Sequence, residues 1–142
     1  MPVSIEEKAA ALGRVPLFAG LNADTMARLS DVAGEVTFPA EHYIVLQGQV
    51  GSGLYVIMRG GARVLSGSRE LARLGPGDFF GELAVIDQEP RTASVQATEE
   101  TVCLGLASWD LLRLLESDST LALNLIRALT ARLRSVTDQH RH

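Results

Sequence analysis

The sequence has few of the residues on which several protein classes depend. Its 142 residues include one cysteine, one tryptophan and two tyrosines. A single cysteine excludes an internal disulfide. Cys103 stands in the apolar run of residues 102–106 with no histidine near it in the sequence, so we expect a buried thiol rather than a nucleophile. The shortage of aromatic residues beside 13 glycines indicates many tight turns.

Positive charge and long apolar stretches are also in short supply. The chain has 13 Lys and Arg against 17 Asp and Glu, so its net charge of −4 gives no overall attraction for nucleic acid. No apolar run approaches the ~20 residues of a membrane span. The first residues lack the basic start and apolar centre of a secretory signal. We therefore expect a cytoplasmic protein with no membrane segment.

What is present is the composition of one ordinary domain. Hydrophobic residues make up 46% of the 142 positions, which is enough to build a core. We expect a single domain over residues 1–142. It should have N-terminal helices in residues 1–34, a β-roll in residues 35–107 and C-terminal helices in residues 108–137.

The first part has two helix signals. Ser4 can cap a helix that Gly13 ends, and Asn22 can cap a second helix that Gly34 ends. In the second helix, apolar residues fall on one side, as in a helix that packs on a core. We expect these helices to be scaffold for the rest of the domain.

From residue 35 to residue 106, short β-rich runs alternate with glycine-bearing turns. Gly60-Gly61 predicts a tight hairpin, and residues 75–78 predict a turn that delivers Phe79 and Phe80 to the core. This texture is typical of a mostly β domain with flanking helices (α+β), built on an antiparallel jelly-roll. The expected strands are residues 35–38, 43–46, 54–59, 62–66, 70–74, 93–97 and 101–106.

The last part predicts two more helices. Ser108 can cap the first, the chain can break and re-cap around residues 117–118, and the second helix should cover residues 119–137. Leucines at 125, 129 and 133 follow helical spacing. They can form a seam with a second subunit or cover the roll.

Residues 80–95 combine parts that suit one small anion carrying a hydroxyl. Gly81 lets the backbone approach a ligand closely, and the residues after it can begin a helical turn whose free N–H groups point at an anion. Arg91 offers a planar fork of donors that matches a phosphate. Glu82 would repel the phosphate but can accept a hydrogen bond from a sugar hydroxyl. A phosphate and a free ribose hydroxyl on one small ligand are the chemistry of a cyclic nucleotide.

This run resembles the phosphate-binding cassette of cyclic nucleotide-binding domains, as found in catabolite-activator-type regulators, cyclic-nucleotide-dependent kinases and gated ion channels. A second run that resembles the family lies upstream, in residues 44–51 and 54–57 and at Gly60. The resemblance covers most of the chain and implies a cassette helix inside the roll. The cassette positions that fit the family are Gly81, Glu82, Ala84, Arg91, Ala93 and Val95.

The resemblance implies a role for each part of the site. Arg91 and backbone N–H groups of residues 81–84 and 92–93 would bind the phosphate, and Glu82 would bind the ribose 2′-hydroxyl. Apolar side chains would flank the base, although these are equally at home as plain core. The last helix would add Arg132 and Val136, although the arginines of this helix fit a solvated face better. The ligand-binding residues so implied are Gly81, Glu82, Leu83, Ala84, Arg91, Thr92, Ala93, Val56, Val64, Leu74, Arg132 and Val136.

The resemblance further implies a regulatory sensor whose C-terminal helices move when ligand binds and signal to a separate protein effector. Thr92 is compatible with cGMP, while cAMP is the commoner ligand, so both are expected. Too few residues follow the last helix for a helix-turn-helix, so we expect no DNA binding by this chain. The alternatives are an interaction module that binds no ligand and a sensory fragment related to Crp/Fnr-type transcriptional regulators.

An enzyme is the remaining class to weigh. Jelly-roll metalloenzymes hold a metal with several histidines inside the barrel, but only His42 lies in the β region of this sequence. We therefore expect no catalytic residue, no metal and no cofactor besides the cyclic nucleotide.

Overall fold

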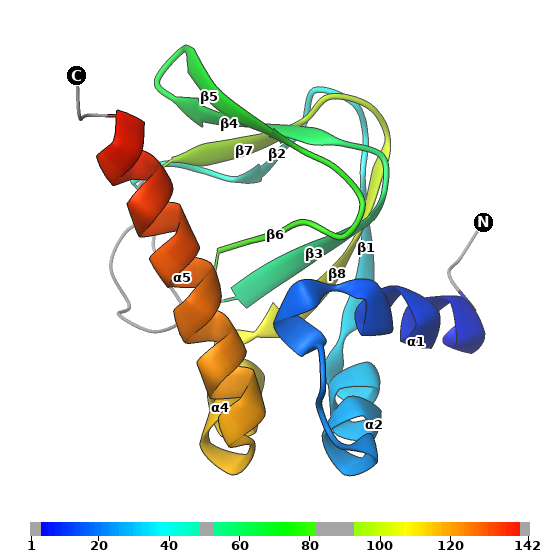
Figure 1. Ribbon diagram of the computed structural model, residues 1–142. Coiled ribbons are helices and arrows are strands. Elements are labelled where there is room, and N and C mark those ends of the chain that lie inside the picture. Colours follow the sequence, from blue (N-terminus) through cyan, green and yellow to red (C-terminus); the bar gives the residue numbers. More distant parts are fainter. Residues whose placement is uncertain (1–3, 49–52, 82–92, 140–142) are drawn as a thin grey trace.

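The computed structural model describes residues 4–48, 53–81 and 93–139 (Figure 1). A layer of helices packs on one side of a roll formed by two antiparallel sheets, which confirms the predicted fold class. The helices are α1 (Ile5–Arg14), the 3₁₀ turn η1 (Pro16–Phe18), α2 (Ala23–Val32), α4 (Ser108–Ser117) and α5 (Ser119–Gln139).

Each sheet has four strands in the described part of the chain. The first sheet has the order β1-β8-β3-β6 and lies next to the helices, and the second has the order β2-β7-β4-β5. The strands are β1 (Gly34–Phe38), β2 (Tyr43–Val45), β3 (Gly53–Arg59), β4 (Ala62–Ser66), β5 (Arg69–Leu74), β6 (Phe79–Phe80), β7 (Ser94–Ala97) and β8 (Thr101–Ala107). All seven predicted strands are present, and the two-residue β6 is additional.

The alternation of side chains along β3 divides the apolar residues into two cores. Leu54 and Val56 point toward the helices, whereas Ile57 points between the sheets. The helix-side core contains Leu12, Val15, Leu17, Phe18, Leu29, Ala33, Leu54, Val56, Leu104, Leu106, Leu111, Leu114, Leu121 and Leu125. The roll interior contains Ile57, Ala62, Phe80, Val95 and Cys103, with Phe38, Ile44, Val45, Tyr55, Val64 and Leu74 packed against them.

The two N-terminal helices begin where the sequence predicts. The Ser4 hydroxyl accepts a hydrogen bond from the backbone N–H of Glu7 at 3.0 Å, and the Asn22 side chain accepts one from Thr25 at 2.8 Å. The predicted end at Gly13 is wrong, because α1 continues to Arg14. The helix stops there because the next position but one is Pro16, and the residue before a proline disfavours helical geometry.

The predicted hairpin at Gly60-Gly61 is wrong, because β3 and β4 belong to different sheets. The chain crosses between the sheets here, with Gly60 at φ +90°. A Cβ on Gly60 would overlap the carbonyl oxygen of Glu100. The Thr101 hydroxyl fixes the crossing by accepting from the Gly61 N–H at 3.2 Å and lying 2.8 Å from the Gly61 carbonyl oxygen.

The predicted turn at residues 75–78 is present. The N–H of Asp78 donates to the Gly75 carbonyl at 3.0 Å, the Gly75 N–H donates to the Asp78 carboxylate at 2.8 Å, and Gly77 has φ +92°. The turn delivers Phe79 to the helix-side core and Phe80 to the roll interior, because consecutive strand residues face opposite sides.

The start of α4 differs from the prediction, whereas the start of α5 agrees with it. Ser108 does not cap α4, because β8 extends to Ala107 and that residue takes the cap position without a side-chain hydrogen bond. The predicted break before α5 is confirmed. The Asp118 carboxylate accepts from the N–H groups of Thr120 at 2.9 Å and Leu121 at 3.4 Å, as a helix cap does.

Candidate functional site

The chain leaves the roll at Gly81 and returns at Ala93. Gly81 follows β6 at φ +95°, a conformation that glycine adopts without strain, and β7 starts at Ser94. The predicted cassette helix and five predicted ligand residues lie outside the described part of the chain. These residues are Glu82, Leu83, Ala84, Arg91 and Thr92.

The residues on either side of this segment pack together. Phe80, at the end of β6, is 6% exposed, and Val95, at the start of β7, is 4% exposed. Both belong to the roll interior, although β6 and β7 are in different sheets. The segment between them therefore starts and ends beside one apolar cluster.

Three aromatic rings line this cluster. The rings of Tyr55 and Phe80 stack with centroids 5.5 Å apart, and Phe38 meets Tyr55 edge to face at 6.1 Å. Sequence reasoning did not name these rings as part of the site. The signal was available in β3, because the period of two that buries Ile57 in the roll places Tyr55 on the same face.

The predicted apolar wall is only partly brought together. Val64 and Leu74 both pack in the roll interior with Val95. Val56 is 1% exposed in the helix-side core, on the opposite face of its sheet. Val56 is thus separated from the other two described wall residues, because successive side chains of β3 point alternately into the two cores.

A small polar network holds the start of β7. The Ser94 hydroxyl accepts a hydrogen bond from the Gln47 N–H at 2.9 Å, and the Gln47 side-chain oxygen accepts one from the Gly67 N–H at 3.0 Å. These bonds tie the exit of the 81–93 segment to the tip of the β4–β5 hairpin. Gln47 stands within the upstream run at residues 44–51, but its role was not predicted from the sequence.

The last helix is fastened to the N-terminal part of the chain. The Asn124 side-chain amide donates to the carbonyl oxygens of Leu17 at 3.0 Å and Ala19 at 2.8 Å, which uses both of its N–H bonds. Arg132 and Val136, the predicted base contacts, lie further along α5, beyond Asn124. Their side chains are outside the described ones.

The three leucines of the predicted seam do not share one environment. Leu125 is 4% exposed and Leu129 packs against the helix-side core, whereas Leu133 is 67% exposed. A different set of α5 side chains lies open beside Leu133. Leu123 is 47% exposed and Ile126 is 58% exposed.

Two buried titratable groups lie outside the predicted site. The Thr25 side chain, followed by the N–H groups of Leu121 and Thr120, lowers the pKa of Asp118 below its ordinary value. Among the described residues, the second carboxylate oxygen of Asp118 has no hydrogen-bond partner. Burial raises the pKa of the Cys103 thiol to about 12, and the thiol is buried as predicted.

Residues 4–48, 53–81 and 93–139 have neither a metal-ion cluster nor a membrane-spanning helix. These ranges contain no group of three His, Cys, Asp or Glu side chains placed to hold a metal ion. Their helices also include none with the length and apolar character needed to cross a bilayer.

Comparison with known proteins finds similar sequences among regulators and kinases. The chain is 36% identical over 124 residues to the cyclic AMP receptor protein of Thermus thermophilus, covering 84% of this chain and 57% of that one. It is 37% identical over 92 residues to the cGMP-dependent protein kinase egl-4 of Caenorhabditis briggsae, covering 61% of this chain and 12% of the kinase. The chain thus spans little more than half of the first relative and a small part of the second.

A solved structure agrees with this relationship. The crystal structure of the Thermus thermophilus catabolite activator protein superposes with a TM-score of 0.79 and 34% identity, covering 87% of this chain and 61% of that one. The sequence model of the cyclic nucleotide-binding domain matches residues 35–118, which is more than half of the chain. The protein therefore belongs to the cyclic nucleotide-binding domain family.

Proposed function

We propose that this protein binds a cyclic nucleotide beside the roll interior and acts as a regulatory sensor. The observation that carries the proposal is the packing around the 81–93 segment. Phe80 and Val95, which bracket the segment, share one apolar cluster with Val64 and Leu74. A ligand bound there would have apolar side chains for its base and the segment's own polar groups for its phosphate and sugar.

The proposed phosphate and sugar contacts come from the cassette. The Arg91 guanidinium neutralises the cyclic phosphate, because its fork of donors matches two phosphate oxygens. Backbone N–H groups of residues 81–84 and 92–93 complete the phosphate contacts. The Glu82 carboxylate accepts a hydrogen bond from the ribose 2′-hydroxyl. This contact would select a ribonucleotide, because a deoxy analogue would leave the carboxylate without its partner.

The proposed base contacts come from three elements. Val64 on β4, Leu74 on β5 and Leu83 in the cassette flank the base. Val56 does not contact the base, because it packs in the helix-side core. Arg132 and Val136 on α5 close over the base from the other side.

We propose that both cAMP and cGMP bind, with cAMP preferred. Thr92 can donate a hydrogen bond to a guanine edge or to the phosphate, so it is compatible with either ligand. Similarity to relatives named for cAMP and for cGMP supports this choice.

The proposed response is a movement of α4 and α5 that a separate effector protein detects. Binding can shift this equilibrium only by the difference in ligand affinity between the two positions. The exposed stripe of Leu123, Ile126 and Leu133 supports α5 as the surface that a second copy or the effector covers. The proposed role is cytoplasmic, and this chain contributes no catalytic step and no DNA contact to it.

Calorimetry with cAMP and cGMP tests the binding proposal. We expect micromolar affinity for the wild type, and a loss of about 100-fold in Arg91→Gln, because a buried phosphate would lose its charged partner. Arg113→Gln is the matched control, since Arg113 is an exposed arginine of α4. No binding of either nucleotide to the folded wild type would refute the proposal and favour an interaction module.

Two further measurements test the details. The ratio of affinities for cAMP and 2′-deoxy-cAMP should fall toward one in Glu82→Gln, whereas an unchanged ratio would contradict the role of Glu82. Ligand should also change the hydrogen-exchange protection of residues 108–137. Equal protection with and without ligand would contradict movement of the C-terminal helices.

A second candidate function differs in the effector that receives the signal. The matched region covers 84% of this chain and 57% of the cyclic AMP receptor protein, which supports correspondence to the sensory part of a Crp/Fnr-type regulator. A pull-down with and without cyclic nucleotide separates the two cases by the identity of the captured protein.

A further inference from the structure

A row of side chains crosses the outer face of the second sheet, away from the roll interior. We call it the outer row: Tyr43 on β2, Gln96 on β7, Arg63 on β4 and Arg73 on β5. Each member stands directly opposite the next in the strand register. The residues beside Arg63 in sequence, Ala62 and Val64, pack in the roll interior, so the outer row faces the other way.

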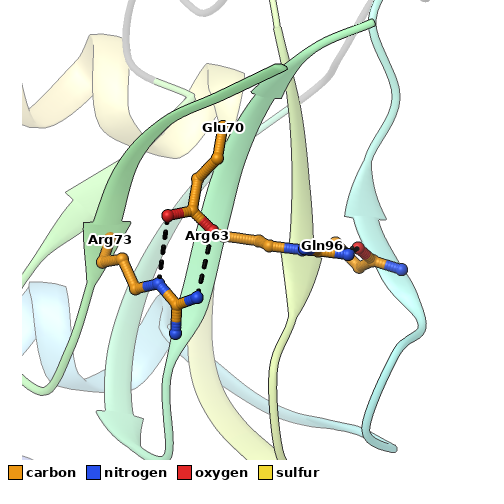
Figure 2. Close-up of polar contacts among 4 residues, drawn as sticks. All are labelled: Arg63, Glu70, Arg73 and Gln96. Carbon is orange, nitrogen blue, oxygen red and sulfur yellow. Dashed lines mark hydrogen bonds and ion pairs between the residues drawn. The ribbon is translucent and has the colours of Figure 1, made fainter. Parts of the chain in front are cut away.

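Arg63 is held in one orientation by its neighbour. Its Nε and Nη2 groups donate to the Gln96 side-chain oxygen at 2.9 and 2.6 Å (Figure 2). Gln96 is itself 8% exposed, and its amide donates to the Glu41 carbonyl at 2.8 Å. Arg63 therefore lies across β7 with part of its guanidinium used, and its Nη1 donors have no partner among the described residues.

The positive charge of Arg63 is not compensated within the described ranges. Its hydrogen-bond partner there is a neutral amide, and the Glu70 carboxylate pairs with Arg73. Arg73 stands directly opposite Arg63, and like charges in such a pair are unfavourable. The sheet thus places two cations opposite each other on neighbouring strands, and the Glu70 carboxylate pairs with one of them, Arg73.

The position of Glu70 depends on an irregularity in β5. The register passes from the Val64–Ala72 pair to the Leu65–Glu70 pair, so Leu71 is an extra residue in the strand. This bulge brings Glu70 onto the face of Arg73, where they pair at 3.1 and 3.2 Å (Figure 2). Arg73 is 68% exposed and Glu70 is 37% exposed, so an incoming carboxylate can compete for the arginine.

We propose that the outer row is a docking surface for an acidic segment of a protein partner. One carboxylate of the segment binds the available donors of Arg63, and a second exchanges with Glu70 for Arg73. Tyr43, which is 47% exposed and belongs to the same row, adds apolar contact. Tyrosine and arginine together are typical of the energetic centres of protein interfaces.

The charges favour a protein over a nucleic acid at this surface. The chain has a net charge of −4, so a long polyanion would be repelled by most of the molecule. A short acidic peptide needs only the local pair of cations. The surface lies on the face opposite the proposed ligand site, so it can be tested without cyclic nucleotide.

Fluorescence anisotropy with a fluorescein-labelled octaglutamate peptide tests the proposal. We expect saturable binding to the intact protein that weakens as salt is raised. Glu70→Gln should tighten binding several-fold, because it frees Arg73, whereas Glu116→Gln makes the same charge change on α4 and should alter it little. Equal tightening by both variants would overturn the proposal, because it would show a response to net charge alone.

Replacement of Arg63, whose guanidinium is bound by Gln96, gives the opposite test. Arg63→Gln should weaken peptide binding about tenfold, while Arg113→Gln on α4 should leave it unchanged. Thermal melts establish that both variants are folded, and the Glu70→Gln result stands by itself if Arg63→Gln is not. Unchanged binding by a folded Arg63→Gln variant would overturn the proposal. So would tighter, Arg63-dependent binding of a labelled single-stranded DNA, which would make the surface a nucleic-acid site.

Discussion

Replacing Gly60 with alanine would test the crossing between the two sheets. Gly60 has φ +90°, where an alanine is strained by about 1–3 kcal/mol. Its Cβ would also overlap the Glu100 carbonyl oxygen and lie 2.8 Å from the Thr101 Cα, and both obstacles are backbone atoms that cannot swing aside. We therefore expect Gly60→Ala to lower the free energy of unfolding by about 3 kcal/mol or more.

The loss can be measured by thermal and urea unfolding followed by circular dichroism. For a chain of this length, each kcal/mol shifts the melting temperature by about 3 °C, so Gly60→Ala should melt roughly 10 °C below the wild type. The matched control is Gly13→Ala, the same substitution inside α1, where a Cβ would meet no atom within 4 Å. Alanine is the better helix former, so this variant should gain about 0.5 kcal/mol.

The two substitutions should change the free energy of unfolding in opposite directions, so the explanation can be refuted. A Gly60→Ala variant that melts within about 2 °C of the wild type would show that the crossing tolerates a side chain. Equal losses in both variants would show that glycine content, rather than the positive φ and the close backbone approach, determines the effect.

Four other predictions concern buried and half-buried residues. Asp118→Asn should lower stability at pH 7, and the difference should shrink below about pH 4 in urea titrations, because a carboxylate with a lowered folded pKa stabilises above its unfolded pKa and loses this as the pH falls through the folded value. Asn124→Ala removes the hydrogen bonds to Leu17 of η1 and to Ala19 just after it, and should cost about 1–3 kcal/mol by the same titration. Cys103, with its pKa raised to about 12, should react with a thiol reagent at pH 8 only as fast as the protein unfolds. Val56→Ala should lower the melting temperature without changing nucleotide affinity, and Val64→Ala should weaken calorimetric nucleotide binding.

The fold class and most element positions follow from local patterns. Short β-rich runs bounded by glycine predicted the strands, and the side-chain oxygens of Ser4 and Asn22 predicted two helix starts. The Gly60-Gly61 hairpin was wrong because a tight turn has the same sequence whether the chain pairs back or crosses to another sheet. Strand partners are set by contacts far apart in the sequence, such as that between Gly61 and Thr101.

The site was harder to predict for a related reason. A period of two tells which residues of β3 share a face, but not which face meets the helices, so Val56 was grouped with Val64. Helical spacing likewise grouped Leu125 with Leu133, although one is buried and the other exposed. The hold of Gln96 on Arg63 depends on the pairing of β4 with β7, which no local pattern specifies. The roles of Glu82 and Arg91 stay predictions, because both lie outside the described residues.

The attachment of α5 to the N-terminal part of the chain, through the hydrogen bonds of Asn124, has a consequence for the extent of the folding unit. The family model matches residues 35–118, yet the helix-side core takes Leu12, Leu17 and Phe18 from before that range and Leu121 and Leu125 from after it. A fragment trimmed to the family boundaries would expose the helix-facing surface of the first sheet and should aggregate. The recognisable stretch of sequence is therefore smaller than the smallest piece of chain that can be expected to fold by itself.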